Sequence, residues 1–427
     1  MSTVNILGDR QAAATPAETL AIMYGPVTRE RMNDPVDLTP LRTALETDDL
    51  DGYLIDADAS DSDQRYVSGF TAPDPYQTLV TQDGVHLLVS GLEYGRAESE
   101  AAADSVSRLS AYDYHEHRAE HGPYGGKLHT LAAFLADHDV ESVAVPRSFP
   151  TGTADGLREQ GLTVTVESEG IVEEIRATKT PWEVNQIRAT QQANEAAMET
   201  AERLIASAEI DDEGGLVLDG TPLTSERVTE EIEVTLLRHG CGLDETIVAC
   251  AADGADPHDR GSGQLTANDL IVIDIFPRDK ETGYFGDMTR TFVRGEPSEE
   301  MVRRYEVTQE AYEAGLEAVE PGVTGEAVHD VVCDVIEDAG YETLRSDPNA
   351  ETGFIHSTGH GVGLDIHEEP RVSPSGGELE PGHVISIEPG IYDPAVGGVR
   401  IEDLVVVTED GYENLTEYRV GLEPVAE

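Results

Sequence analysis

The sequence predicts an α/β domain over residues 1–171 followed by an α+β domain over residues 172–427. In the first part, short strand patterns alternate with a helical pattern, which is typical of a small α/β domain. In the second part, two helical patterns precede each of two strand hairpins, so this half looks duplicated in outline. A length of 427 residues also agrees with two domains.

Three strand patterns and one helical pattern define the first domain. Residues 51–55 are predicted as a strand, and residues 77–82 and 85–90 as a hairpin that turns at Asp83 and Gly84, a dipeptide typical of tight turns. Residues 97–106 are predicted as a helix.

Four helices are predicted in the second domain, over residues 181–208, 225–239, 298–319 and 324–339. Thr180 and Ser298 each place a capping hydroxyl before acidic residues of a first turn, and Gly340 follows the last periodic residue as a stop. Because each pair of helices precedes one hairpin, we expect a pseudo-symmetric curved sheet with helices outside it and a site between its two halves.

Charged or metal-binding side chains interrupt stretches of the second domain that are otherwise suited to a core. The five residues are Asp274, Asp287, His360, Glu388 and Glu402. Asp274 lies within the apolar run 270–276, where a carboxylate is tolerated only if a metal or a hydrogen-bond partner offsets its desolvation. A strand-end aspartate facing water would explain one such case. That explanation fits poorly with two further carboxylates in apolar strand patterns, at 384–388 and 399–402.

The spacing of the four carboxylates predicts two opposed pairs. Asp274 and Asp287 are symmetric about a centre between residues 280 and 281, which places them directly opposite each other in a hairpin, with Cβ atoms roughly 5 Å apart. Glu388 and Glu402 are symmetric about Ala395 in the same way. Carboxylates this close repel each other unless a cation lies between them.

His360 lies between glycines that allow close backbone approach, and its imidazole can complete the ligand set. A lone histidine is more often structural, but four accompanying carboxylates favour a metal site. We expect two divalent ions, with Mn²⁺ favoured and Co²⁺, Fe²⁺ and Zn²⁺ as alternatives, because the donors are mostly hard oxygens without a thiolate. Two such ions activate water and polarise a carbonyl, so the expected chemistry is hydrolysis.

The segments that carry these residues resemble the metal-binding signature of the pita-bread metallopeptidases, a family that includes prolidase, aminopeptidase P and methionine aminopeptidase, with creatinase as a metal-free relative. The matching segments are residues 272–275, 283–292, 359–368, 387–392 and 399–403. The resemblance implies the pita-bread (creatinase/aminopeptidase) fold for the C-terminal catalytic domain. Residues 65–70 and 90–97 are similar to the N-terminal domain of creatinase and prolidase, which methionine aminopeptidases lack.

The resemblance also implies roles for residues around the metals. His258 and His367 match histidines that contact the scissile peptide and stabilise the tetrahedral intermediate, although His258 also suits a loop side chain in water. Glu388 is expected to shuttle a proton to the leaving nitrogen as well as to bind metal. His356 matches a histidine near the pocket for the leaving proline, and the alternative is that it only supports the Gly-rich segment that follows it. Arg400 is expected to orient a bridging ligand or to form an ordinary ion pair.

The implied activity is hydrolysis of Xaa-Pro bonds in short proline-containing peptides. Arg371 matches an arginine with which prolidases bind the free carboxylate of a dipeptide, so an Xaa-Pro dipeptidase (prolidase) is favoured over an aminopeptidase P, although a surface arginine on a loop is also common. A small-amide hydrolase and a non-catalytic peptide-binding module stay open as further alternatives. Phe276 departs from the small residue common in relatives and leaves the substrate size open.

The composition indicates the setting. There are 85 acidic residues against 28 basic ones, a net charge of −57, which would repel nucleic acid and anionic membranes. We expect a cytoplasmic protein of a salt-accumulating organism that low salt destabilises. The three cysteines, Cys241, Cys250 and Cys333, are expected to be reduced core residues. Residues 1–26 show no export signal, no apolar run could span a membrane, and the resemblance implies a homodimer.

Overall fold

The computed structural model describes residues 36–426. The expectation about an export signal in residues 1–26 therefore lies outside the described residues. None of the helices in the described part is long and apolar enough to cross a membrane.

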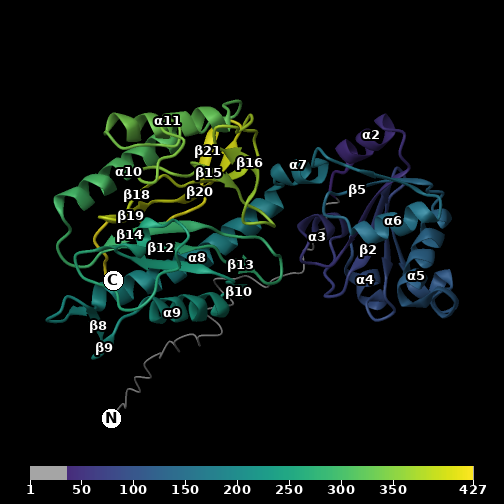
Figure 1. The fold of residues 1–427 in the computed structure, drawn as a ribbon, viewed down its shortest axis with the longest axis horizontal. Helices are drawn as coiled ribbons and strands as arrows, with labels where there is room; N and C mark the ends of the chain where they lie inside the picture. The colour runs from purple at the N-terminus through teal and green to yellow at the C-terminus, as the bar shows by residue number, and fades with distance from the viewer. Residues whose placement is uncertain (1–35, 427) are drawn as a thin grey trace, which may run out of the picture. The chain divides into compact units, whose positions relative to one another are not determined.

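The N-terminal part is built on a six-stranded mixed sheet with the strand order β4-β3-β2-β1-β5-β6. The strands are β1 Gly52–Ala57, β2 Tyr76–Thr81, β3 Val85–Val89, β4 Ser105–Arg108, β5 Ser142–Val145 and β6 Thr163–Val166. The helices are α2 Thr39–Thr47, α3 Ser62–Ser68, α4 Tyr94–Glu100, α5 Tyr114–Asp137, α6 Thr151–Glu159 and α7 Ile171–Ala177 (Figure 1). The predicted α/β architecture is confirmed.

Side chains alternate between the two faces of this sheet. Leu88 packs in a core with residues of α5 and α6, whereas Leu87 and Val89 pack in a second core with Ala97 of α4. The predicted hairpin is confirmed, with Gln77 opposite Leu88. The predicted helix over residues 97–106 is wrong, because α4 ends at Glu100 and β4 follows. The amide of Ala102 donates to the carbonyl of Ser68 instead of continuing the helix.

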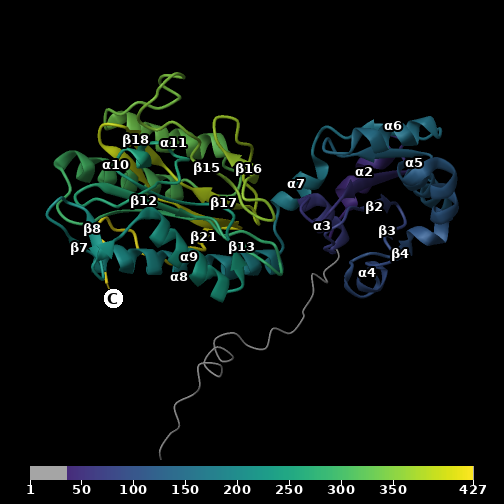
Figure 2. The same cartoon turned by 60° about the horizontal axis from the view of Figure 1, so that its bottom comes forward.

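The C-terminal part contains two helix pairs with strands between them. The helices are α8 Pro181–Ser207, α9 Ser225–Arg238, α10 Glu299–Glu317 and α11 Gly325–Asp338. In Figures 1 and 2, α8 and α9 lie on one side of the strands and α10 and α11 lie on the other. All four predicted helices are confirmed within two residues at each end. Thr180 forms a capping box with Glu183, and Ser298 accepts a hydrogen bond from the amide of Met301.

The strands of this part form several small sheets. Two three-stranded sheets have the orders β11-β12-β14 and β7-β8-β9, a five-stranded sheet has the order β16-β15-β17-β20-β21, and two two-stranded sheets are β10-β13 and β18-β19. The strands are β7 Glu209–Ile210, β8 Leu216–Leu218, β9 Thr221–Pro222, β10 Cys241–Gly242, β11 Thr246–Cys250, β12 Leu270–Ile275, β13 Arg278–Asp279, β14 Met288–Val293, β15 Gly359–Gly361, β16 Glu368–Val372, β17 Val384–Ile387, β18 Gly390–Asp393, β19 Gly397–Arg400, β20 Asp403–Thr408 and β21 Gly411–Asn414.

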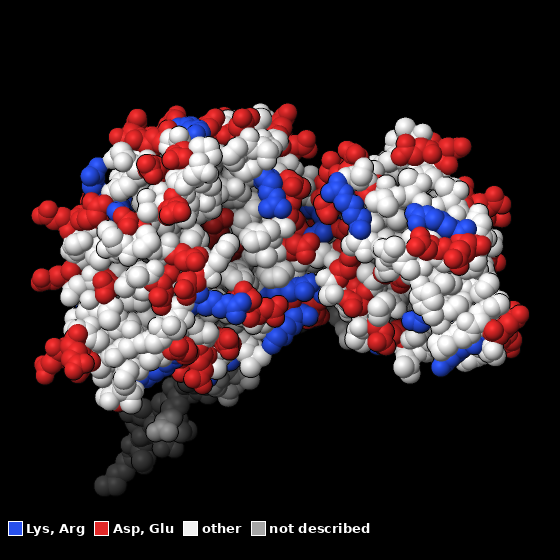
Figure 3. Space-filling view, in the orientation of Figure 1, with Lys and Arg blue, Asp and Glu red and all other residues white. Residues whose placement is uncertain are grey.

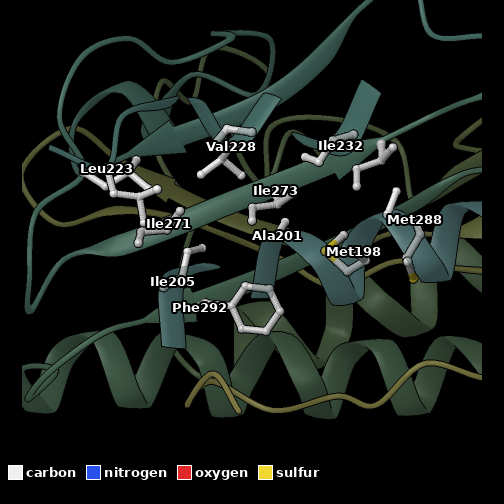
Figure 4. Close-up of a cluster of buried hydrophobic side chains, with 14 of the residues drawn as sticks. Met198, Ala201, Ile205, Leu223, Val228, Ile232, Ile271, Ile273, Met288 and Phe292 are labelled. Atoms are coloured by element: carbon white, nitrogen blue, oxygen red, sulfur yellow. The ribbon is translucent and has the colours of Figure 1, made fainter. Parts of the chain in front are cut away.

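Each helix pair buries its apolar face on its own strands. Figure 4 shows one of these cores, in which Met198 and Ile205 of α8 and Ile232 of α9 pack with Ile273 of β12 and Phe292 of β14. Full burial of one side chain of this size stabilises the fold by about 1.5–3 kcal/mol. In the second core, side chains of α10 and α11 pack with β17, β19 and β20. The predicted duplication in outline is therefore present in the packing.

The two predicted carboxylate hairpins differ in outcome. In the second, Gly390 pairs with Arg400 in one ladder and Ile387 with Asp403 in the next, so Glu388 and Glu402 lie between two ladders that share the predicted register. That prediction is confirmed.

In the first hairpin, Asp274 lies opposite Thr289 instead of Asp287, so the predicted register is wrong by two residues. The carboxylate of Asp279 accepts the amides of residues 281 and 282, which moves the centre of the turn one residue along the chain. Gly283 then takes a positive φ of 83°, a conformation that glycine adopts without strain. Because side chains alternate along a strand, a shift of two residues leaves both aspartates on the same face.

The cysteines are free thiols in the described structure. Cys241 and Cys333 are buried, and Cys250 is half-buried. Burial raises the pKa of the Cys333 thiol to about 11, so the thiol is protonated and unreactive at neutral pH. The prediction of reduced cysteines in the core is confirmed for the two buried residues.

Candidate metal centre and active site

The five predicted ligands come from five different places in the C-terminal part. Asp274 lies within β12, Asp287 directly precedes β14, His360 lies in β15, Glu388 directly follows β17, and Glu402 lies between β19 and β20. All are buried except Glu388, which is half-buried. They meet because both carboxylate hairpins and the β15 strand direct these side chains toward one cavity.

The ligand atoms lie close together. His360 Nε2 is 3.2 Å from Glu388 Oε1 and 3.7 Å from Asp287 Oδ2. One ligand atom each of Asp287, His360 and Glu402 lies within 4.8 Å of the others. His360 Nδ1 lies 3.1 Å from the carbonyl oxygen of Gly361, which fixes the proton on Nδ1 and leaves the Nε2 lone pair directed at the carboxylates.

The electrostatics of these residues fit divalent cations. Burial and the neighbouring carboxylates raise the pKa values of Asp287 and Glu402 well above their usual range. Burial also raises the pKa of Asp274, although Arg400 acts in the opposite direction. The Oδ1 atom of Asp274 is buried without a hydrogen-bond partner. Such a cluster of desolvated oxygens is costly in the protein alone and suits one or more bound cations.

A cavity of about 1070 Å³ brings the predicted site residues together. Its wall includes all five predicted ligands and all five other residues that the sequence singled out, namely His258, His356, His367, Arg371 and Arg400. Phe276 is also part of this wall. The volume lies slightly above the roughly 300–1,000 Å³ that is typical of small-molecule sites, so Phe276 leaves room for a peptide.

The three additional histidines differ in their surroundings. The His367 ring lies edge-on to His360 at 4.3 Å between centroids, and burial and His360 lower its pKa to about 4. His356 Nε2 lies 2.9 Å from the hydroxyl of Tyr392, and burial lowers its pKa to about 4. Both rings are therefore neutral at pH 7. His258 is exposed and lies at the cavity wall, a position compatible with either of the roles expected for it.

Arg400 is buried among the carboxylates. It donates from Nη2 to Asp274 Oδ2 at 2.6 Å, from Nη1 to the Tyr392 hydroxyl at 2.8 Å, and from Nε to the Thr289 hydroxyl at 3.0 Å. Thr289 also donates to Glu402 Oε2 at 2.7 Å. The sequence reasoning gave Thr289 and Tyr392 no role. Thr289 could have been found from its position two residues after Asp287, which places both side chains on the same face of the strand.

The segment that carries His367 is held by buried ion pairs. Glu368 pairs with Arg176 at 2.7 Å and with Lys179 at 2.6 Å, and Arg176 also pairs with Asp365 at 2.7 Å. Arg176, Lys179 and Glu368 are all buried. These contacts bracket His367 on both sides and limit its movement. The sequence gave no signal for Arg176, because its partners are more than 100 residues away along the chain, with Asp63 before it and Asp365 and Glu368 after it.

Arg371 lies in β16 at the cavity wall, with 44% of its side chain exposed. Its single ion pair in the described structure is with Glu369, at 3.4 Å. An exposed pair at this distance contributes little, so the guanidinium is available for a ligand in the cavity.

Comparison with known proteins identifies the class of protein. The chain belongs to metallopeptidase family M24, whose family model matches residues 185–409, and a model of the creatinase/prolidase N-terminal domain matches residues 38–178. The fold is therefore a creatinase-type N-terminal domain followed by a pita-bread catalytic domain, as the resemblance implied. The protein is a metallopeptidase, and its family implies divalent metal ions.

Three relatives illustrate the similarity. A curated Xaa-Pro dipeptidase of Pyrococcus horikoshii is 28% identical over 381 residues, which cover 87% of this chain and 94% of the relative. The structure of an Xaa-Pro dipeptidase from Bacillus anthracis has a TM-score of 0.75 at 25% identity, over 90% of this chain and 98% of the other. The structure of an X-Pro aminopeptidase from Thermotoga maritima has a TM-score of 0.73 at 25% identity, over 88% and 98%.

Proposed function

We propose that this protein is a metal-dependent Xaa-Pro dipeptidase. The observation that carries the proposal is the convergence of four carboxylates and one imidazole on a cavity whose wall also holds a largely unpaired arginine, Arg371. The curated relative from Pyrococcus horikoshii, which spans most of the chain, is named for the same activity.

The ligands of the metals would be Asp274, Asp287, His360, Glu388 and Glu402. When bound, two divalent ions supply an activated water and a Lewis acid for the peptide carbonyl. We favour Mn²⁺ because four of the five donors are carboxylates, and we keep Co²⁺, Fe²⁺ and Zn²⁺ as alternatives.

The protein side chains would position the substrate and move the proton. Glu388 accepts a proton from water and returns it to the leaving nitrogen. His367, neutral at pH 7, donates an N–H to the developing oxyanion, and His258 at the cavity wall adds a second contact to the peptide. His356 lies against Tyr392, where it would border the leaving proline. The proline nitrogen of an Xaa-Pro bond carries no hydrogen in the substrate. None of these side-chain roles requires an N–H there, so the proposed mechanism accommodates proline.

Arg371 is the basis for preferring a dipeptidase. Its guanidinium would bind the free carboxylate of the C-terminal proline through two hydrogen bonds. A longer peptide has a peptide bond at this position instead of a free carboxylate. Aminopeptidase P activity stays the alternative, and the similarity to the X-Pro aminopeptidase of Thermotoga maritima supports it. The presence of all five ligand types argues against a peptide-binding module without catalysis. The size of the cavity argues against a hydrolase for small amides only.

We further propose that the protein works at high salt inside the cell, as a homodimer, with its domains divided at residues 171 and 172. Acidic side chains are spread over the visible face in Figure 3, in line with 85 acidic residues against 28 basic ones. The dimer rests on the family resemblance alone. The division is placed after β6, the last strand of the N-terminal sheet, which ends at Val166, and the model of the N-terminal domain matches as far as residue 178.

The proposal is tested by proline release in multimolar KCl with added Mn²⁺, comparing Xaa-Pro dipeptides with Xaa-Pro-Yaa tripeptides. We expect higher kcat/KM for dipeptides and no turnover by Asp287→Ala, which loses a ligand. Preference for tripeptides would assign the protein as an aminopeptidase P. Turnover of neither substrate by the metal-loaded protein would overturn both assignments.

A further inference from the structure

Three histidines meet on α5, in the N-terminal domain and outside the site described above. His117, His121 and His129 each offer one ring nitrogen within 4.8 Å of the others. The His121 and His129 rings are stacked with centroids 3.9 Å apart, and the centroids of His117 and His129 are 5.5 Å apart. Imidazole is the commonest metal-binding side chain, so the grouping points to a metal site.

The backbone of α5 builds this grouping. Gly122 has φ 76° and ψ 176°, which breaks the helix before Pro123, so His129 lies on a different helical segment from the other two histidines. A Cβ atom on Gly126 would lie 2.6 Å from the Cα of Arg118, and one on Gly125 would lie 2.8 Å from the Cβ of His121. The two segments therefore pack in direct contact. Glycines at these positions bring His129 to the others.

The surroundings of the cluster leave its nitrogens available. His121 is exposed, and His117 and His129 are half-buried. The one ion-pair contact of the cluster within residues 36–426 joins His121 Nε2 to Glu120 Oε2 at 3.8 Å, which is too long for a hydrogen bond. Zinc–nitrogen bonds of about 2.0–2.1 Å in a tetrahedral arrangement place the nitrogens about 3.3 Å apart. The three nitrogens already lie within 4.8 Å of one another, so small side-chain rotations of these partly exposed rings bring them to this spacing.

We propose that His117, His121 and His129 form a binding site for one transition-metal ion that prefers imidazole, with Zn²⁺, Ni²⁺ or Cu²⁺ as its ligand class and Glu120 or water in the fourth position. Three imidazoles are softer donors than the four carboxylates of the catalytic cavity. The two sites therefore differ in selectivity, because Mn²⁺ favours carboxylate oxygens and Zn²⁺ and Cu²⁺ favour imidazole. An ion bound here joins the two segments of α5 across Gly122.

The test counts metals on the full chain. The protein is dialysed against saturating Mn²⁺ with added Zn²⁺, and both metals are measured per chain by mass spectrometry. We expect the wild type to carry one more Zn²⁺ than the double variant His121→Asn/His129→Asn. The matched control His115→Asn removes a histidine of the same helix outside the cluster, and it should keep the wild-type count. Displacement of Mn²⁺ from the catalytic cavity would be the same in all three proteins.

The single variant His121→Asn, at an exposed position, perturbs the fold less than the double variant. It should weaken Zn²⁺ binding by roughly tenfold or more, because loss of even an outer-shell partner of a metal ligand typically weakens metal binding by that factor. Equal zinc counts in the wild type and the double variant would overturn the proposal. Peptidase activity with Mn²⁺ should be unchanged in these variants, so the outcome is independent of the proposed catalytic function.

Discussion

Arg400 and Asp274 form a buried ion pair in which Nη2 donates to Oδ2 at 2.6 Å. One oxygen of Asp274 is thus neutralised by the protein, whereas the other, Oδ1, has no hydrogen-bond partner. The arginine holds the first ligand in place and leaves one of its oxygens for a metal. Because the guanidinium also reaches Tyr392 and Thr289, it connects ligands from both hairpins.

The substitution Arg400→Lys should therefore weaken catalysis although it keeps the charge. A lysine ammonium is a point donor and cannot reach all three acceptors of the guanidinium. Loss of one charge-assisted hydrogen bond costs about 1.5–3 kcal/mol, so we expect kcat/KM for an Xaa-Pro dipeptide to fall roughly 10- to 100-fold. The matched control is Arg260→Lys, at an exposed arginine of the same cavity that pairs with Glu245. Equal losses in both variants would contradict the role of Arg400.

The sequence predicts the strand register of one carboxylate hairpin and not of the other. The register about Ala395 was predictable, because two ladders on either side of Glu388 and Glu402 share it. The register about Asp274 was not, because the side chain of Asp279 captures two amides and moves the turn. The number of residues between Asp274 and Asp287 does not reveal these hydrogen bonds, so the spacing alone could not predict where the turn is centred.

Contacts between distant segments were also beyond the sequence. Arg176 pairs with Glu368, and Arg290 is fully buried with Asp403, but periodicity gives no partner for either arginine. The three histidines of α5 were missed for a related reason. Residues 117, 121 and 129 are not all on one face of a continuous helix, and only the break at Gly122 brings the last of them close.

The choice between dipeptides and longer peptides should depend on Arg371. In Arg371→Ala the free carboxylate of the substrate loses its partner, a loss of about 1.5–3 kcal/mol. We expect KM for an Xaa-Pro dipeptide to rise at least roughly tenfold, with little change for the corresponding Xaa-Pro amide, which lacks the carboxylate. An equal effect on the acid and the amide would show that Arg371 does not bind that group.

Chelation should remove activity and lower the thermal stability. Without cations, Asp287 and Glu402 are desolvated by burial and repelled by the neighbouring carboxylates, the two effects that raise their pKa values. Metal at 100 times its Kd stabilises a protein by about 2.7 kcal/mol per site, which corresponds to several degrees in Tm. Calorimetry with and without a chelator measures the shift, and Asp287→Ala serves as the control. A variant that responds to chelation as strongly as the wild type would contradict the assigned ligand.

The unfolding free energy should depend on pH through His383. Burial and Lys179 lower the pKa of His383 to about 4, and its Nδ1 accepts the amide of Glu380, which only the unprotonated nitrogen can do. The unfolded chain binds this proton below pH 6.5 and the folded chain only below about pH 4. The contribution of His383 to the unfolding free energy is therefore complete above pH 6.5. It declines as the pH falls toward 4, by at most about 3 kcal/mol.

The variant His383→Asn keeps an acceptor near the amide of Glu380 but does not titrate. We expect its Tm to fall less than that of the wild type between pH 6.5 and 4. The exposed His239 supplies the control, because His239→Asn should follow the wild type over the same range. A wild-type slope in His383→Asn would show that other groups carry the pH dependence.

Low salt should destabilise the fold, because a net charge of −57 on 427 residues produces strong repulsion between surface acids. The screening length falls from about 10 Å at 0.1 M salt to about 3 Å at 1 M, so we expect Tm to rise steeply with KCl in this range. Sucrose at equal osmolality is the control, since it favours compact states without screening charge. The exposed pair Asp212 and Glu213 offers a matched variant, Asp212→Asn/Glu213→Gln, whose Tm should depend less on KCl than that of the wild type. A rise in Tm that sucrose reproduces would assign the effect to solvent exclusion and contradict charge repulsion as its cause.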